Sequence, residues 1–273
     1  MVSSINKIFV CLYKEDQTHI VSDLYQPIVA GESVIFNPEF IGDGTGESIH
    51  KLNEEFGELT ALYWIWKNQK CLDIIGHCHY RRYFWPHTNQ FLIPESYSKD
   101  KFEISKNNFE FDMAELLGEN DIVLPPISYL KTTVADQFKK YHHEHNLDLM
   151  RSVLSNFDAE SLSNWDKLLL GNRVYLKLIF FMRREVFESY CNWIFPILFQ
   201  FNQRKIQSGD LYQRRAEAFL AERLTLLFVL KNNLKVREVP YVFVSSKTKY
   251  VPYFWHGIKN QFNQYIFQVR NVL

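Results

Sequence analysis

Short apolar runs alternate along this chain with segments that carry apolar residues at helical spacing. Ile8–Tyr13 is an uninterrupted apolar run of the kind that forms a strand buried on both faces. Further strands are predicted over 72–79, 121–124, 175–182 and 236–244, and helices over 53–68, 133–143, 147–156, 158–170, 184–201 and 211–230. The first helix has Asn53 as a suitable N-cap. The alternation predicts an α/β fold, a mixed sheet flanked by helices, with parallel neighbours favoured.

The length of 273 residues allows one large domain or two small ones. No internal repeat or linker is visible, so we predict one α/β domain over 1–244 and a C-terminal segment over 245–273. The 31 basic and 31 acidic residues balance, and we expect no nucleic-acid partner. Four cysteines without C-x-x-C spacing indicate a reducing compartment, and no apolar run is long enough for a signal peptide or a membrane span. These features predict a cytoplasmic location.

The C-terminal segment is both basic and apolar. Seven basic residues and one acidic residue lie between residue 231 and the end, whereas the first 230 residues carry an acidic surplus. Apolar residues recur there at helical intervals, at Trp255, Ile258, Phe262, Ile266, Val269 and Leu273. Such a helix could lie on an anionic membrane, peripherally at the inner face of the cell membrane. The alternative is that it packs on the α/β domain or on a partner subunit.

Two polar segments follow predicted strands, where open α/β sheets bind ligands. The first combines Lys14 with the glycine-rich loop around Asp43, which could approach a phosphate or sugar but is equally typical of an ordinary turn. The second runs from His77 to Phe84 and contains the adjacent Arg81 and Arg82. Two neighbouring guanidiniums suit phosphate oxygens, unless they pair with carboxylates from nearby helices. Strand alternation would place these two arginines on opposite faces.

The predicted helix around residues 212–224 is a third candidate. Arg215 and Glu222 are seven residues apart and nearly aligned, so a carboxylate could be presented to a cleft beside a guanidinium. A solvated charged face is the alternative. Aromatic residues make up 16% of the chain, and we expect one group of them to surround the arginine pair. This group is Tyr63, Trp64, Tyr80, Tyr83, Phe84 and Trp85.

Several strings, in their order along the chain, resemble a bacterial family of capsular and exopolysaccharide gene clusters, long labelled a domain of unknown function and regarded as glycosyltransferase-like. The two most specific strings are Glu58-Leu-Thr-Ala-Leu-Tyr-Trp-Ile-Trp-Lys-Asn68 and Cys78-His-Tyr-Arg-Arg-Tyr-Phe84. The supporting strings are Ile41-Gly-Asp-Gly-Thr-Gly46, Ile75-Gly76, Asp121-Ile-Val-Leu-Pro125, Asp136-Gln137 and Phe219-Leu-Ala-Glu-Arg-Leu224. The resemblance covers about residues 41–224.

The resemblance implies a GT-A-like fold of Rossmann type and transfer of a sugar from a nucleotide-sugar donor, UDP-linked and galactosyl, pyranose or furanose, to a cell-surface polysaccharide. The expected acceptor is an oligosaccharide or a lipid-linked glycan. With the residue patterns above, it predicts three groups of site residues. Catalytic roles fall to Glu222, Asp136, Arg81 and Arg82; donor binding to Lys14, Asp43, Glu58, Tyr63, Lys67, His79 and Arg223; and acceptor binding to His142, His143 and Arg215. The sequence departs from the family pattern at His77, Leu178 and Ala218.

Two points of mechanism follow. No two aspartates are two residues apart, so the Asp-x-Asp motif with which many GT-A enzymes hold Mg²⁺ or Mn²⁺ is missing. We therefore assign no metal ligand and expect the arginine pair to stabilise the departing diphosphate by fixed charge. A divalent ion, Mg²⁺ or Mn²⁺, is the alternative, with Glu110-x-Asp112 as its residual candidate site. An inverting transfer needs a carboxylate base, for which the sequence order of preference is Glu222, Asp136 and Glu58. The alternative function is a non-catalytic carbohydrate-binding or scaffolding subunit that retains the fold.

Overall fold

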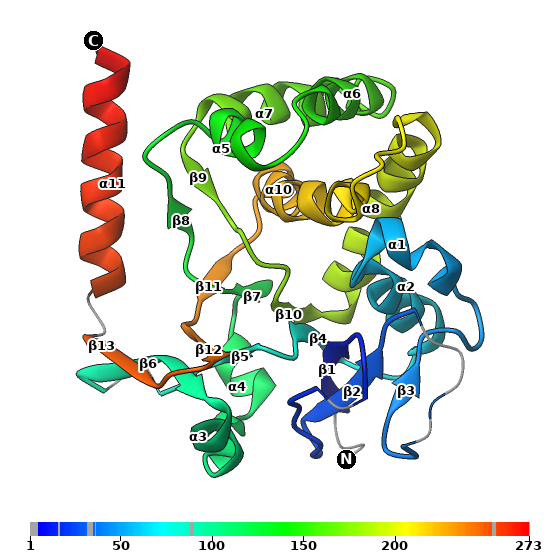
Figure 1. Ribbon diagram of the computed structural model, residues 1–273, viewed down its shortest axis with the longest axis vertical. Helices are drawn as coiled ribbons and strands as arrows, with labels where there is room; N and C mark the ends of the chain where they lie inside the picture. Colours follow the sequence, from blue (N-terminus) through cyan, green and yellow to red (C-terminus); the bar gives the residue numbers. More distant parts are fainter. Residues whose placement is uncertain are drawn as a thin grey trace.

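The computed structural model describes residues 5–15, 17–31, 35, 37–87, 90–252 and 255–272, without the side chains of 256 and 270–272. A central sheet runs through the molecule, with most of its helices on one face (Figure 1). Its main part has the order β3-β2-β1-β4-β10-β7-β11, in which β10 alone is antiparallel to its neighbours. These strands are β3 Ile41–Gly42, β2 Tyr25–Val29, β1 Asn6–Leu12, β4 Ile74–His79, β10 Phe180–Arg183, β7 Ile122–Leu124 and β11 Val236–Glu238.

A second wing of the sheet continues from β4 through a tight turn. Its strands, in the order β5-β12-β6-β13, are β5 Arg82–Phe84, β12 Tyr241–Ser245, β6 Leu92–Ser98 and β13 Lys249–Pro252. The predicted closing strand over 236–244 is therefore two strands, since the chain leaves β7 after Glu238 and reaches the wing at Tyr241. Pro240 lies between them and has no backbone N–H for a ladder. The wing extends past residue 245, because β13 pairs with β6.

The helices form a layer on one face of the main sheet and a smaller group beneath the wing (Figure 1). Helix α8 packs on β4, β10, α2, α6 and α10. The helices of this layer are η1 His50–Leu52, α1 Asn53–Phe56, α2 Leu59–Asn68, α5 Val134–Tyr141, α6 His145–Leu154, α7 Ala159–Leu170, α8 Arg184–Arg204, α9 Leu211–Arg214 and α10 Ala216–Lys231. Under the wing lie α3 Lys99–Glu103, η2 Lys106–Phe109 and α4 Met113–Leu117. The predicted mixed α/β fold is confirmed.

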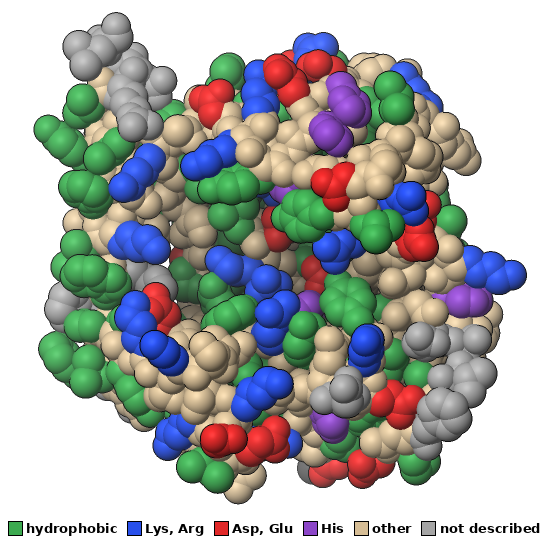
Figure 2. Space-filling view, viewed as in Figure 1, with side chains coloured by type: hydrophobic (Ala, Val, Ile, Leu, Met, Phe, Trp, Pro, Cys, Tyr) green, Lys and Arg blue, Asp and Glu red, His purple; other side chains and the backbone are tan. Residues whose placement is uncertain are grey.

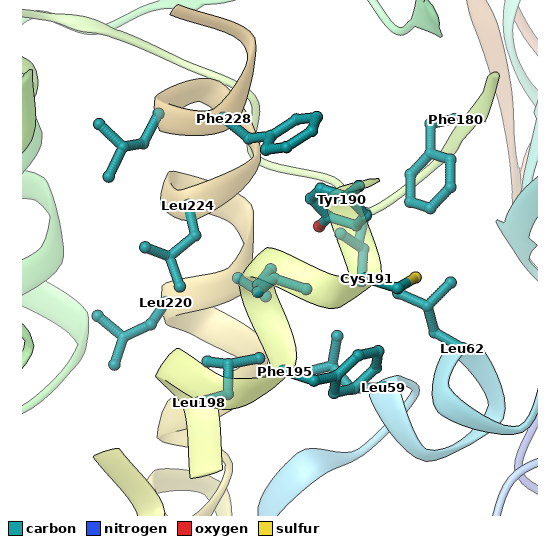
Figure 3. Packing of buried hydrophobic residues seen from close by; sticks show 14 of the residues in the cluster. Leu59, Leu62, Phe180, Tyr190, Cys191, Phe195, Leu198, Leu220, Leu224 and Phe228 are labelled. Atoms are coloured by element: carbon teal, nitrogen blue, oxygen red, sulfur yellow. The ribbon is translucent and has the colours of Figure 1, made fainter. Parts of the chain in front are cut away.

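The larger core lies between the main sheet and α8. Apolar side chains from α2, α8 and α10 meet there and exclude water, which is the main favourable contribution to folding (Figure 3). Trp66 stacks on Phe195 with ring centroids 5.5 Å apart. This core also fixes the helix ends that border the sheet, because α2 and α10 both pack on α8.

Two of the predicted helices are interrupted, and both breaks matter for the site. The helix over 53–68 stops at Gly57, whose φ of 53° favours glycine, and restarts as α2. Asn53 does not cap this helix; its side-chain amide donates to the Gly57 carbonyl and to Thr60 Oγ1 across the break. The helix over 211–230 breaks at Arg215, between α9 and α10.

The C-terminal segment ends in α11, Trp255–Val272, as the apolar spacing predicts. This helix stands at the side of the molecule next to the small sheet of β8, Ser128–Tyr129, and β9, Arg173–Val174 (Figure 1). Leu273, the last residue of the predicted stripe, lies outside the described residues. In the part of the chain that the structure describes, no helix is long and apolar enough to cross a membrane.

Candidate functional site

A cavity of about 440 Å³ opens where β1 and β4 end. Tyr13 follows β1 and His79 ends β4, so the cavity lies at the carboxyl ends of two parallel strands, the usual ligand position of such sheets. The break between α1 and α2 and helices α5, α9 and α10 complete its wall. Figure 2 shows a central hollow with Lys and Arg side chains gathered at its rim. The lining residues are Tyr13, Gly57, Glu58, His79, Arg81, Arg82, Gln137, Tyr141, His142, Leu176, Tyr212, Arg215, Ala218, Phe219, Glu222 and Arg223.

Glu58 reaches this cavity because of the break between α1 and α2. Gly57 packs close to Arg215 and Tyr13, where a side chain at position 57 would come within 3.6–3.8 Å of them. Glu58 Oε2 is buried and finds no hydrogen-bond partner among the described residues. Burial raises the pKa of Glu58 to about 7, although Arg82 and Arg215 oppose this rise. Glu58 is thus a carboxyl group that can exchange a proton near neutral pH.

The turn between β4 and β5 brings Arg81 and Arg82 to the same cavity. The expected alternation onto opposite faces is wrong here, because β4 ends at His79 and the chain reverses before β5. Arg81 lies over the rings of Tyr80 and Phe243, at 4.9 and 5.8 Å from their centroids. The two guanidiniums therefore face one volume from a short turn that a β-hairpin holds in place.

The imidazole of His79 lies beside this turn and is neutral. Its Nδ1 accepts a hydrogen bond from the Arg81 backbone N–H at 3.4 Å. Burial lowers the pKa of His79 to about 2, with Arg82 and Arg81 adding to the effect. An imidazole with such a pKa carries no charge at neutral pH, so it adds no positive charge to the cavity.

Helix α10 contributes an ion pair to the opposite wall. Arg223 is almost completely buried, and its Nη1 donates to Glu222 Oε2 at 2.8 Å. Its Nη2 donates to Gln137 Oε1 on α5 at 2.5 Å, while its buried Nε has no partner among the described residues. Burial raises the pKa of Glu222, and Arg223 opposes the rise. Glu222 is therefore held by a guanidinium, whereas Glu58 is not hydrogen-bonded in this way.

Aromatic rings form one side of the cavity, but they are not the rings that the sequence indicated. His142 stacks on Phe219 with ring centroids 3.9 Å apart and lies parallel to Tyr212 at 5.9 Å. Burial lowers the pKa of His142 to about 4, helped by Arg223. Tyr83, Phe84 and Trp85 instead belong to the core under the wing, since strand alternation and the packing of α3 and η2 bury them. The expected aromatic group is therefore wrong for these three rings, whereas Tyr80 does lie against Arg81.

Six of the predicted site residues do not line the cavity. Asp43 is buried and accepts a hydrogen bond from the Gly31 N–H at 2.8 Å, which ties the glycine-rich loop to the end of β2. Tyr63 and Lys67 bind Glu47 at 3.0 Å, because their side of α2 faces away from the cavity. Exposed positions outside the cavity are occupied by Lys14, Asp136 and His143.

Asp136 and His143 are each next in sequence to a residue that lines the cavity, yet neither of them lines it. Asp136 lies in the first turn of α5, where its backbone N–H donates to the capping Thr133 Oγ1. The cavity instead receives Gln137, Tyr141 and His142 from the same helix and its C-terminus. His143 stacks on His145 at the surface. The residues that sequence reasoning missed, Tyr13 above all, could have been found from their place directly after a buried strand.

Residues 7–233 match the family described as "Domain of unknown function (DUF4422)". This match covers most of the 273 residues. The chain belongs to this family. No curated protein sequence matches the chain.

The DUF4422 chain is also similar to a solved structure entitled "WbbM bifunctional glycosytransferase apo structure". The TM-score is 0.78 at 24% sequence identity, which establishes a shared fold. The similar region covers 89% of this chain and 45% of that one, so the DUF4422 chain spans less than half of the WbbM protein.

Two of the departures expected from the family pattern touch each other. His77 is buried on β4, and its Nδ1 bonds to the Leu178 carbonyl at 2.9 Å. Burial lowers the pKa of His77 to about 4, so the imidazole is neutral and donates this bond. The predicted strand over 175–182 is regular only in β10, and residue 178 precedes it. The third departure, Ala218, lines the cavity beside Phe219.

The histidines do not gather into a metal site. Within the described ranges, no three His, Cys, Asp or Glu side chains lie close enough together to hold a metal ion. His77 and His79 lie on β4, whereas His142 follows α5, where it stacks on Phe219.

Proposed function

We propose that this DUF4422 chain is a glycosyltransferase that moves a sugar from a nucleoside diphosphate sugar to a saccharide acceptor. One observation carries the proposal. Four guanidiniums, an unpartnered carboxylate and stacked aromatic rings line one cavity at the strand ends. The fold shared with the bifunctional glycosyltransferase supports it. The specific donor that we propose is UDP-linked and galactosyl, and the acceptor a capsular or exopolysaccharide chain.

The arginine pair is suited to the leaving diphosphate. When the bond between the anomeric carbon and the phosphate oxygen breaks, negative charge develops on the diphosphate. Arg81 and Arg82 face this cavity together with Arg215, and His79 beside them is neutral. Guanidinium groups bind phosphate oxygens through paired hydrogen bonds and need no metal ion for this. They would therefore stabilise the charge as it forms.

Glu58 is the base that we propose, ahead of Glu222 and Asp136. It takes the proton of the acceptor hydroxyl; the oxygen bonds to the anomeric carbon, and the nucleoside diphosphate leaves with the electron pair of the broken bond. A base with a pKa near the operating pH is effective in such a step, and the pKa of Glu58 is about 7. Glu222 is tied to Arg223 at 2.8 Å, and Asp136 is exposed outside the cavity.

The ring cluster on the other side is suited to the acceptor. Tyr212, Phe219 and the neutral His142 present flat faces on which a sugar ring can stack. Arg215 lies over Tyr212 at 5.4 Å from the ring centroid, so the cluster adjoins the charged part of the cavity. We therefore propose that the acceptor is bound by four side chains of this cluster, those of His142, Tyr212, Arg215 and Phe219.

Nucleotide binding and turnover test the proposal. Thermal shift with UDP, GDP and their sugars, with EDTA or with added Mn²⁺, should show stabilisation by one nucleotide series in both conditions. Slow release of the free nucleotide from that donor should follow. Arg82→Gln should weaken nucleotide binding by about tenfold or more, whereas the surface variant Arg151→Gln should not. Glycan binding without nucleotide affinity would instead identify a non-catalytic carbohydrate-binding subunit, and strict dependence on Mn²⁺ would overturn the metal-free step.

A further inference from the structure

Helix α11 turns two of its amides, Asn260 and Asn263, toward the rest of the protein. Asn260 Oδ1 accepts from the Tyr129 backbone N–H at 3.4 Å, and its Nδ2 donates to the Ile127 carbonyl at 3.0 Å. Asn263 Nδ2 donates to the Tyr129 carbonyl at 2.7 Å. These bonds satisfy the free edge of β8, whose other edge pairs with β9. These hydrogen bonds hold α11 against β8, beside the half-buried Ile266 and Phe267.

Most of the apolar side chains of α11 are exposed, although Ile266 and Phe267 are half-buried. Five of them are 41–65% exposed, namely Trp255, Ile258, Phe262, Tyr265 and Val269. Figure 2 shows hydrophobic side chains along the outer edge of the molecule where α11 stands. A surface helix of a globular protein normally buries its apolar stripe against the core and exposes its polar face. In α11 most of this stripe stays exposed, so packing on the α/β domain is not what the structure shows for the greater part of the predicted stripe. Ile266 alone of its described members is half-buried.

The charged and aromatic residues on and beside this stripe indicate what kind of surface binds it. The sequence of α11 contains Lys259 and Arg270 and no acidic residue, and Lys131 Nζ lies 5.6 Å from the Phe262 ring centroid. Trp and Tyr favour the boundary between lipid headgroups and acyl chains, and cations beside them attract anionic lipids. We propose that α11 lies in the surface of an anionic lipid bilayer, with its apolar stripe among the headgroups.

A second copy of this chain fits the stripe less well. The spacing of 255, 258, 262, 265 and 269 alternates three and four residues, as in a coiled-coil seam. Such seams, however, use Leu, Ile and Val and place opposite charges beside them, whereas three of these five residues are aromatic. Two copies of α11 would bring only positive charges together. An anionic bilayer accommodates both the aromatic side chains and the positive charge of α11.

A second cavity lies beside α11. It has a volume of about 330 Å³, and its lining includes Lys259 and Asn263 of α11 together with Lys177 and Leu176. Leu176 also lines the main cavity, and Lys177 lowers the pKa of Glu222 through its charge. The membrane proposal stands on the α11 surface alone and does not depend on the proposed reaction.

Vesicle flotation of the full chain tests the inference. The protein should float with phosphatidylcholine vesicles that contain phosphatidylglycerol, and much less with phosphatidylcholine alone. Phe262→Ser/Tyr265→Ser should weaken binding to the anionic vesicles at least about tenfold, since both side chains are exposed and leave the core intact. The matched control is Ile104→Ser/Ile206→Ser, which removes two side chains that are 80% and 77% exposed elsewhere.

The oligomeric state of the protein distinguishes a bilayer from a second copy of the chain as the binding partner of the stripe. Light scattering after gel filtration should give a monomer for the full chain and for both double variants, each with an unchanged thermal unfolding curve. No flotation with anionic vesicles, or equal loss in the control variant, would overturn the proposal. So would a dimer that Phe262→Ser/Tyr265→Ser dissociates, because the stripe would then be an interface between copies.

Discussion

Glu217 and Glu58 both have buried carboxylate oxygens, but only Glu217 is paired with a cation. Glu217, in the first turn of α10, is completely buried, and its carboxylate receives Lys205 Nζ and Asn202 Nδ2 at 2.7 Å each. Glu58, at the start of α2, has a buried oxygen with no hydrogen-bond partner among the described residues. A paired carboxylate contributes to the structure, whereas an unpaired one costs stability and remains available to a substrate. The difference therefore separates a structural site from a functional one.

The largest expected effect concerns the rate of sugar transfer. Glu58→Gln should lower kcat by about 10²–10⁴-fold, because an amide cannot take the acceptor proton. Donor affinity should change little. Glu222→Gln should cost less, and Glu55→Gln, whose side chain does not line the cavity, should have no effect. Steady-state kinetics with the donor found by thermal shift would measure these values, and a larger loss in Glu222→Gln than in Glu58→Gln would restore Glu222 as the base.

The paired glutamate should affect stability. Lys205→Met leaves the Glu217 carboxylate buried without its cation, which should lower the free energy of unfolding by about 3–5 kcal/mol. The double variant Lys205→Met/Glu217→Leu should recover most of this loss, because neither charge remains. Urea unfolding of the two variants measures both values. If the single variant is as stable as the parent, the Glu217 pair is not a structural ion pair of the kind that we describe.

The unpaired glutamate should make stability depend on pH. The pKa of Glu58 is raised in the folded protein from 4.5 to about 7 by burial, so the folded state holds a proton that the unfolded state releases. This contribution is complete below pH 4.5 and is lost as the pH rises to about 7. Relative to the parent, Glu58→Gln should therefore gain about 2–3 kcal/mol between these limits. A constant difference across this range would show that the pKa of Glu58 is ordinary.

The smallest effect concerns the neighbours of Glu58. Arg215 lowers the pKa of Glu58, although burial has the larger, opposite effect. Arg215→Gln should therefore raise the pKa of Glu58 and move the rising limb of the pH–rate profile to higher pH by roughly half a pH unit. Arg214→Gln is the matched control, because Arg214 binds Glu54 outside the cavity. A shift of the limb to lower pH would contradict the proposed electrostatic environment of Glu58.

Local sequence signals predicted the elements of the fold better than the positions at which they break. The apolar runs gave β1, β4 and β7, and helical spacing gave α5, α7 and α11, since each signal depends on neighbouring residues. The breaks at Gly57 and Arg215 and the reversal after His79 were missed. They depend on contacts between residues far apart in the chain, such as Gly57 against Arg215.

The same contrast holds for the candidate site. The sequence by itself determined that arginines, glutamates and histidines stand near the strand ends, because buried strands in an α/β chain must end at one edge of the sheet. Only the tertiary structure decided which of them share a cavity. It turned Arg81 and Arg82 inward together, left Glu58 unpaired and paired Glu222 with Arg223. It also decided that most of the apolar stripe of α11 is exposed, because hydrogen bonds to β8, and not helical spacing, set how that helix is rotated.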